Sequence, residues 1–412
     1  MLGRLRLVRR VRALVRADPA GIRAGFVAHL LATATGLVAG LTLGAITDTL
    51  EQLPGLLVLF PAAVGLRGNV FGALGSRLGT LVATGTFRLS ARRETEVGQN
   101  LMAAVGLSLS LSLVLAVVAK ITAEAFGVRG AIDIEDFVVV SVAGALIPTA
   151  VVMAITVGVA AVGMQRDWDI DNVTVPVVTA AGDMVTLPSL FLATYLVRDV
   201  PGWLPLALAT ICAVIGLGAL VGAIRSHLDA LRRVTRESLP FLVVAGVLST
   251  LAGITIQSRF DTFARDPALL IVIPPLLSLS GSLAGILSAR VSTKLHLGTL
   301  DASRLAMRPV AEDLTLVYAV ALPTFLVLGL AADVLAVVVD LSSPGVLEML
   351  ALMLLAGIVA TTLANVIAYL AALVTYRLGW DPDNNGIPIV SSASDFLGAA
   401  SLMVSIAILG FT

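Results

Sequence analysis

Long apolar runs separated by short polar stretches extend along almost the whole chain of 412 residues. The eleven runs cover residues 26–50, 54–87, 99–123, 137–164, 173–197, 203–224, 240–258, 267–296, 313–340, 345–376 and 386–411. Each run is close to or longer than the roughly 20 residues with which a helix crosses a bilayer. Because a backbone in lipid must satisfy its hydrogen bonds internally, the pattern predicts eleven transmembrane helices.

Composition places the chain outside the range of soluble globular domains. Hydrophobic residues make up 58% of the chain and charged residues 13%, and the mean hydropathy is +1.00. We therefore expect an all-α polytopic membrane protein in contact with membrane lipid. The 27 basic and 27 acidic residues cancel, so the net charge gives no indication of a nucleic-acid partner.

Residues for redox or enzymatic chemistry are not grouped in the sequence. The single cysteine, Cys212, has no partner for a disulfide or a thiolate metal site. His29, His227 and His296 show no metal-ligand spacing. No pairing of a nucleophile with a base appears either. We expect neither an enzyme nor an organic cofactor.

Positive charge is unevenly distributed between the expected loops. Residues 1–25 form a basic arm, which we expect to be retained and cytoplasmic, because the following run is long and lacks a clear cleavage site. The loops on that side then contain Arg88, Arg92, Arg93, Arg166, Arg225, Arg232, Arg233, Arg236, Arg304, Arg308 and Arg377. The outer loops contain Glu124, Asp133, Glu135 and Asp136, although Arg198, Arg259 and Arg265 oppose the bias. The positive-inside rule predicts a multi-pass cell-membrane protein with its N-terminus cytoplasmic and its C-terminus outside.

The chain contains an internal repeat. FPAAVGLRGNVFGALGSRLGTLVATGT, at 60–86, aligns with IPPLLSLSGSLAGILSARVSTKLHLGT, at 273–299. DWDIDNVTVPVVTAAGD, at 167–183, aligns with GWDPDNNGIPIVSSASD, at 379–395. The matched pairs include Pro61 with Pro274, Gly68 with Gly281, Arg77 with Arg290, Asp169 with Asp381, and Asp183 with Asp395.

Each repeat holds five spans, so its chain leaves the membrane on the side opposite to its entry. The extra apolar run at 202–225 can return the chain, which makes the repeats parallel. We expect a pseudo-twofold axis along the membrane normal. The predicted organisation is an arm at 1–25, a first repeat at 26–200, a linker helix and basic loop at 201–239, and a second repeat at 240–412.

With these motifs the sequence resembles the MgtE-type magnesium transporters, and especially the two-repeat solute carrier family 41 branch. The resemblance rests on PAAVGLRGN with SRLGT, PLLSLSGS with ARVST, and the two D-x-D-N…P…D segments, and it covers about 26–411. Bacterial members that resemble each half are homodimers, so the resemblance implies a covalently fused dimer: a monomeric pseudo-dimer, with a dimer of whole chains left open. The second Gly-Asn motif reads Gly281-Ser282, which implies unequal halves. No magnesium-sensing domain is apparent ahead of the membrane region, so the family's gating mechanism is not carried over.

The duplicated acids favour cation transport on physical grounds as well. Asp183 lies ten residues after Val173, or about 15 Å along a helix, which is near mid-membrane. An ionised acid facing lipid there costs at least about 2.5 kcal/mol, so it should face an aqueous path. Asp183 and Asp395 related by a twofold axis can share a divalent cation, and Thr179 and Ser391 lie one turn before them. The alternative is a pair of packing acids.

Two other sets of residues remain open between a role in the site and a structural role. Asp169 and Asp381 precede helix starts, where they can lie at a pore mouth or cap free N–H groups. Gly68-Asn69 and Gly281-Ser282 are predicted to break their helices and line the site, with Asn69 the better candidate. Tight packing of small residues is the alternative. For Arg77 and Arg290 we expect a structural role.

The predicted function is transport of a divalent cation, most simply Mg²⁺, through a pore between the repeats. Its predicted metal-binding residues are Asp183, Asp395, Asn69, Thr179, Ser391, Asp169 and Asp381. One alternative is a secondary transporter of a small organic substrate, which only 5% aromatic residues disfavour. The other is a membrane scaffold that transports nothing. Channel and coupled exchanger are not distinguished.

Overall fold

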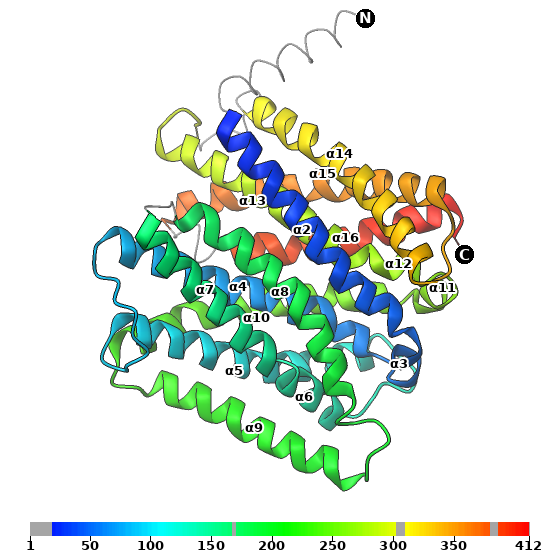
Figure 1. Ribbon diagram of the computed structural model, residues 1–412, viewed down its shortest axis with the longest axis horizontal. Coiled ribbons are helices and arrows are strands. Elements are labelled where there is room, and N and C mark those ends of the chain that lie inside the picture. Colours follow the sequence, from blue (N-terminus) through cyan, green and yellow to red (C-terminus); the bar gives the residue numbers. More distant parts are fainter. Residues whose placement is uncertain (1–18, 167–169, 302–309, 380–385, 412) are drawn as a thin grey trace, which may run out of the picture.

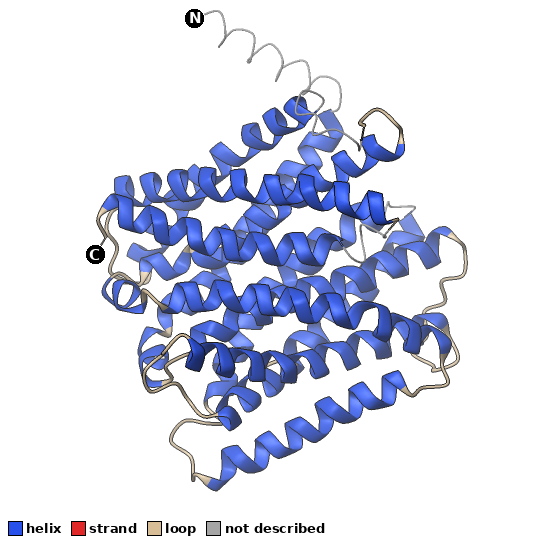
Figure 2. Cartoon of the chain, turned by 180° about the vertical axis from the view of Figure 1, so that it is seen from behind, coloured by secondary structure: helices blue, strands red, loops and turns tan. Residues whose placement is uncertain are grey.

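The computed structural model describes residues 19–166, 170–301, 310–379 and 386–411, and all the elements in these ranges are helices (Figures 1 and 2). The helices are α2 (Pro19–Ala45), α3 (Thr47–Gln52), α4 (Leu56–Ala83), α5 (Glu96–Ala125), α6 (Ile134–Ala143), α7 (Leu146–Arg166), α8 (Ile170–Thr194), α9 (Trp203–Ile224), α10 (Asp229–Gln257), α11 (Phe260–Arg265), α12 (Ala268–Ile271), α13 (Ile273–His296), α14 (Ala311–Val338), α15 (Val346–Leu378) and α16 (Ile387–Leu409).

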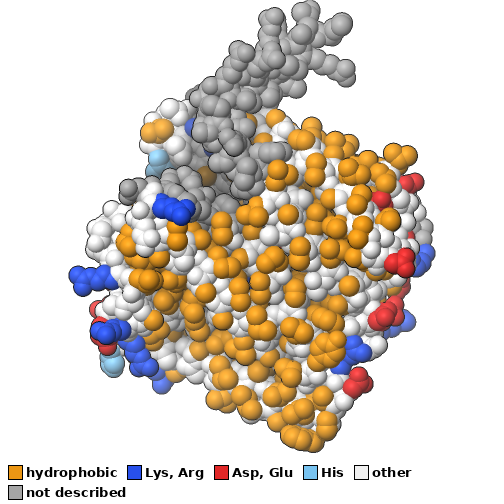
Figure 3. All heavy atoms as spheres, in the orientation of Figure 1, with side chains coloured by type: hydrophobic (Ala, Val, Ile, Leu, Met, Phe, Trp, Pro, Cys, Tyr) orange, Lys and Arg blue, Asp and Glu red, His pale blue; other side chains and the backbone are white. Residues whose placement is uncertain are grey.

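Ten helical segments in the described part of the chain are long and apolar enough to cross a membrane. They follow the predicted runs, and α6 and α7 together form one of them. The run predicted at 26–50 corresponds to α2, whose apolar part within the described residues, His29–Ala45, is shorter. Hydrophobic side chains cover the middle of the face shown in Figure 3, and charged side chains lie near its left and right edges. This band is what a lipid-facing surface requires.

The two repeats have the same helix order. The corresponding pairs are α2 with α10, α3 with α11, α4 with α12–α13, α5 with α14, α6–α7 with α15, and α8 with α16. In Figure 1, α3 and α11 lie at the same right-hand edge. The helices that precede them, α2 and α10, therefore end on one side of the bundle, and the repeats run in the same direction. Gly85 and Gly298, which follow α4 and α13, share a left-handed φ of +69° that suits glycine.

The repeats exchange their first helices. α10 packs against α4 of the first repeat, and α2 packs against α12 and α13 of the second. Two equivalent glycines make this approach close: a Cβ added at Gly253 would lie 2.3 Å from the carbonyl oxygen of Val58, and one at Gly40 would lie 1.9 Å from that of Ile271. Small residues of this kind let helix backbones meet in a membrane. Each repeat is therefore completed by a helix of the other.

The linker helix α9 crosses outside this core. It packs mainly on α5 and α6 of the first repeat and lies along the lower edge of Figure 1. Only 22% of its apolar window is buried, against 72% for the window in α4. Side chains such as Trp203, Leu206 and Val214 are exposed on it. The second repeat has no counterpart of this helix among the described residues.

The predicted breaks at Gly68-Asn69 and Gly281-Ser282 are wrong. Both α4 and α13 continue unbroken through these pairs. The glycines provide close contact between helices instead, as the site geometry below explains. A break does occur at Gly144, between α6 and α7, where an added Cβ would lie 2.8 Å from the Leu190 side chain.

Candidate cation site between the two repeats

Asp183 on α8 and Asp395 on α16 are buried at the interface of the repeats, with 4% and 8% of their surfaces exposed. Each acid contacts the opposite repeat. Ser278 on α13 hydrogen-bonds to Asp183, and a Cβ added at Gly65 on α4 would lie 3.2 Å from Oδ2 of Asp395. Gly65 and Ser278 are equivalent positions in the aligned motifs. The two contacts are therefore reciprocal, as a pseudo-twofold axis between the acids requires.

The acids differ in how well their oxygens are hydrogen-bonded. The Ser249 hydroxyl on α10 donates a 2.9 Å hydrogen bond to Oδ2 of Asp395. Oδ2 of Asp183 is buried without a hydrogen-bond partner among the described residues. The two carboxylates are close enough to repel one another when ionised. A cation between them removes that repulsion and gives the free oxygen a partner.

The hydroxyl residues predicted one turn before the acids face the glycine motifs. A Cβ added at Gly68 would lie 3.8 Å from Oγ1 of Thr179, and one at Gly281 would lie 3.6 Å from Oγ of Ser391. α4 thus meets α8 at Gly68, and α13 meets α16 at Gly281, in the same way. The structure brings Thr179 and Ser391 into the layer of the acids, on equivalent helices.

For the remaining predicted residues, no hydrogen bond to the acids is found in the described part of the chain. Asn69 is half-buried on α4, directly after Gly68. Its counterpart Ser282 is exposed, and its hydroxyl lies 3.4 Å from Nε2 of His29. Asp169 and Asp381 lie outside the residues that the structure describes.

The donor set consists of oxygens. Among the described residues, no group of three or more His, Cys, Asp or Glu side chains comes together. Two carboxylates with hydroxyls nearby suit a hard cation, such as Mg²⁺ or Ca²⁺, and provide few of the nitrogen or sulfur ligands that transition metals prefer. A cation held by two carboxylates keeps most of its water.

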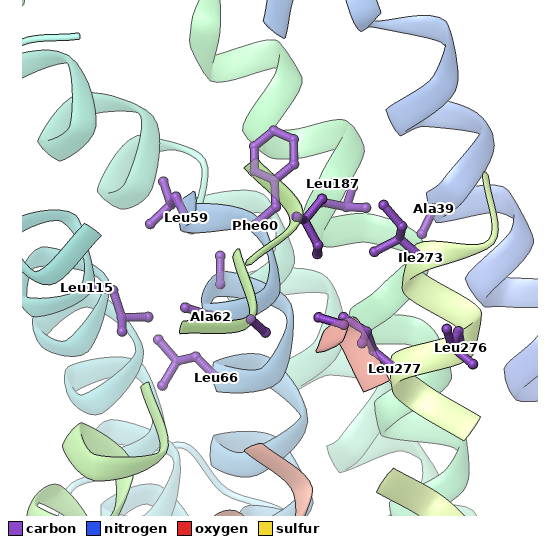
Figure 4. Close-up of a cluster of buried hydrophobic side chains, with 14 of the residues drawn as sticks. Ala39, Leu59, Phe60, Ala62, Leu66, Leu115, Leu187, Ile273, Leu276 and Leu277 are labelled. Atoms are coloured by element: carbon purple, nitrogen blue, oxygen red, sulfur yellow. The ribbon is translucent and has the colours of Figure 1, made fainter. Parts of the chain in front are cut away.

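Buried apolar side chains of both repeats, drawn in Figure 4, lie along α4 and α13 between the acids' contact positions, Gly65 and Ser278, and the helix ends that follow α3 and α11. The α4 residues Phe60 and Ala62 precede Gly65, and the α13 residues Ile273 and Leu277 precede Ser278. All four are buried, and Leu187, one turn beyond Asp183, joins them. Side chains of both repeats fill this level, so it excludes water between the acids and that edge of the bundle.

One buried charge near the site was missed by sequence comparison. Arg67 on α4 is completely buried, and its guanidinium donates 3.0 Å hydrogen bonds to the hydroxyls of Ser108 and Ser112 on α5. It escaped notice because its counterpart is Ser280, so the repeat does not mark it. The signal that could have found it is an arginine in the middle of a long apolar run.

The duplicated arginines interact with acids on α10 and α14 rather than with Asp183 and Asp395. Nη1 of Arg290 lies 3.3 Å from Oδ1 of Asp313, which also pairs with Lys294. Arg77 interacts electrostatically with Glu237 on α10. The expectation of a structural role agrees with these contacts.

Comparison with known proteins identifies the family. The profile of the MgtE family, described as a divalent cation transporter, matches residues 60–193 and 273–405, one segment in each repeat. The chain belongs to the MgtE family of divalent cation transporters. It is therefore a transporter and not an enzyme, and it contains two MgtE domains, each ending beyond one of the two acids.

Similar full-length proteins belong to solute carrier family 41. The chain is 28% identical to solute carrier family 41 member 2 of Xenopus laevis, over 88% of this chain and 67% of that protein. It is 25% identical to member 3 of Rattus norvegicus, over 88% of this chain and 82% of that protein. No solved structure matches the chain.

Proposed function

We propose that this MgtE-family protein transports Mg²⁺ along a path between its two repeats, and that Asp183 and Asp395 bind the ion on its way. The reciprocal contacts of the acids carry this proposal. Each acid reaches the opposite repeat at equivalent positions, Ser278 and Gly65. A single ion on the pseudo-twofold axis would be within reach of both carboxylates.

The chemistry of the site favours an ion that keeps its water. Mg²⁺ loses water reluctantly and is usually held by one or two carboxylates plus several waters. Thr179, Ser391 and Asn69 would complete the shell through water or directly. Asp169 and Asp381 remain proposed ligands of the pore mouth on sequence grounds alone.

The apolar layer of Figure 4 supports a gate on one side of the site. Phe60, Ile273 and Leu187 fill the level between the acids and the edge at which α3 and α11 lie. A hydrated ion could not pass this level without a rearrangement of the two repeats. The proposed state is therefore closed toward the α3 and α11 side.

The orientation in the membrane completes the proposal. With a cytoplasmic N-terminus in the cell membrane, the closed side faces outward, the C-terminus lies outside, and the axis relating the repeats follows the membrane normal. The proposed segments are an arm at 1–25, repeats at 26–200 and 240–412, and a linker at 201–239. Cysteines placed at Arg88 and Leu297 in a Cys212→Ser background should react from the same, cytoplasmic side.

Ion flux through purified protein in liposomes tests the site. We expect Asp183→Asn and Asp395→Asn each to lower Mg²⁺ flux at least tenfold, because each removes half of the charge that binds the ion. The double variant should lose less than the sum of the two single losses in ΔG, since both acids serve one ion. Mg²⁺, Ca²⁺, Na⁺ and pH gradients varied separately would define selectivity and coupling.

A matched control separates charge at the site from burial of an acid in general. Asp333 on α14 is also 4% exposed, but it accepts a hydrogen bond from Ser343 away from the repeat interface. Asp333→Asn should leave flux nearly unchanged. Wild-type flux in a correctly inserted double variant, Asp183→Asn with Asp395→Asn, would refute the proposed site. Flux that appears only in vesicles holding two or more chains would refute the proposal that a single chain is sufficient.

A further inference from the structure

Arg67 is a buried positive charge without a carboxylate partner. No part of its side chain is exposed, and its hydrogen bonds to described residues go to neutral hydroxyls, those of Ser108 and Ser112. Its Nε has no hydrogen-bond partner, and Arg67 forms no ion pair with a described residue. An arginine remains protonated in such surroundings, so the charge is permanent.

The Arg67 side chain leaves α4 next to the residue that precedes one of the two acids. A Cβ added at Gly182 would lie 3.4 Å from Cβ of Arg67, and Gly182 directly precedes Asp183. The next residue on α4, Gly68, meets Thr179. The backbone of Arg67 therefore lies at the level of the acids on α4. Its side chain extends from there toward α5, on the side of α4 that faces away from the proposed ion path.

The second repeat lacks the charge and still builds the same arrangement. Ser280 stands at the position of Arg67, and Phe325 stands on α14 where α5 has Ser112. Phe325 is completely buried. A neutral serine with an aromatic ring behind it thus suffices for the contacts of α13 with α14 and α16. A structural need of the fold does not explain why one repeat carries an arginine here.

We propose that Arg67 is a fixed counter-charge that weakens divalent-cation binding at Asp183 and Asp395 and thereby speeds release of the ion. This inference rests on the proposed function of the two acids. Two ionised carboxylates alone give the empty site a charge of −2, and Arg67 reduces the charge that the ion experiences. Its repulsion acts twice as strongly on a divalent as on a monovalent ion. As a general scale, a unit charge about 12 Å from a divalent ion corresponds to roughly a hundredfold in affinity at an effective dielectric constant of about 20.

Neutralising the side chain at similar length is the direct test. Arg67→Gln should lower the Kd for Mg²⁺ at least tenfold in isothermal titration calorimetry of the purified protein, and it should slow flux at saturating Mg²⁺. Arg67→Lys keeps the charge and should stay within about twofold of the wild-type Kd. Arg77→Gln removes a half-buried charge of α4, ten residues farther along, and should also leave the Kd unchanged.

A second route cancels the charge without removing the arginine. Ser112→Asp places a carboxylate at the hydroxyl that Arg67 already contacts at 3.0 Å. It should tighten Mg²⁺ binding as Arg67→Gln does, whereas the neutral Ser112→Asn should not. This pair keeps the test decisive even if Arg67→Gln does not fold.

The outcomes separate this inference from the proposed function. Loss of Mg²⁺ binding in Asp183→Asn and Asp395→Asn, together with an unchanged Kd in both Arg67→Gln and Ser112→Asp, would overturn only the role of Arg67. Unchanged binding in the acid variants would overturn the site itself. Equal weakening by Arg67→Gln and Arg67→Lys would also contradict the inference and identify a packing role.

Discussion

The two repeats share the contacts of their glycine motifs and differ in the layer behind those motifs. At the motifs, Gly68 meets Thr179 as Gly281 meets Ser391. Behind them, the first repeat holds a polar cluster of Arg67, Ser108, Ser112 and Thr149, in which the hydroxyls of Ser108 and Thr149 lie 2.6 Å apart. At the spacing that relates the aligned motifs, the second repeat has Ser280, Ala321, Phe325 and Thr361.

The buried hydroxyl of Thr361 shows a consequence of this difference. Thr361 occupies the position of Thr149 but has no hydrogen-bond partner in the described part of the chain, because Ala321 stands where Ser108 would accept or donate. The comparison teaches that the contacts of the glycine motifs recur in both repeats, whereas the layer that supports them varies even at some energetic cost. Differences between the halves of the path are therefore expected to originate behind the site.

The largest effect should come from the contacts that the repeats share. Gly40→Ala and Gly253→Ala each place a methyl group against backbone atoms, of Ile271 and Val58, that cannot rotate away. We expect both variants to lose most of the monodisperse protein in size-exclusion chromatography, since overpacking costs about 1–3 kcal/mol or more.

A glycine on the linker helix provides the control for these two changes. Gly218 on α9 is exposed, and an added Cβ there meets no described atom within 4 Å, so Gly218→Ala should behave like the wild type. If Gly40→Ala were tolerated and Gly253→Ala were not, the equivalence of the two crossings would be wrong.

A smaller loss of stability is expected from changes near the C-terminal ends of α4 and α13. Asp313, with 5% of its side chain exposed, pairs with Arg290 and Lys294, whereas the first repeat has Asn100 at this position. Asp313→Asn leaves two bases without their acid. We expect a loss of about 1–3 kcal/mol, below the value for a fully buried pair because both bases are partly exposed.

Thermal unfolding in detergent measures this loss, and Asn100→Asp is the reciprocal variant. Oδ1 of Asn100 and Nε of Arg77 are both buried and have no hydrogen-bond partner among the residues that the structure describes. An acid at position 100 should therefore raise the Tm if it meets Arg77 as Asp313 meets Arg290. A lower Tm would show that the two ends are built differently.

The smallest effect concerns the unpartnered hydroxyl of Thr361. Ala321→Ser restores the partner that Ser108 provides in the first repeat, and we expect it to stabilise the protein by about 0.5–1.5 kcal/mol. Ser108→Ala should destabilise it by about 1–3 kcal/mol, because it leaves Thr149 and Arg67 short of a partner. Opposite shifts in Tm check both, and a destabilising Ala321→Ser would show that the position has no room for a hydroxyl.

The repeat carried most of what could be predicted from sequence. Residues that recur, above all Asp183 with Asp395 and Thr179 with Ser391, led to the helix order and to the layer in which these side chains meet. The exchange of α2 and α10 could not be predicted, because Gly40 and Gly253 appear in sequence only as small residues in apolar runs. Which helix approaches a glycine is set by tertiary packing.

The errors have the same origin. Gly68 and Gly281 suggested broken helices, but in lipid an unbroken backbone satisfies its own hydrogen bonds, and a glycine there serves close packing as readily as a break. Arg67 was overlooked because a comparison of repeats emphasises what is shared. The comparison revealed an inequality within a shared motif, at Ser282 opposite Asn69, but not one at a position that no motif marks.

The linker helix α9 has a consequence for how such a protein can change over generations. In a pore made of two identical chains, every substitution appears on both sides of the axis at once, so an arginine beside the ion would arrive as a pair. A tether joins the halves into one gene product and lets each accumulate its own mutations. Arg67, with Ser280 at the equivalent position, is an asymmetric substitution that a fused chain can inherit and a homodimer cannot.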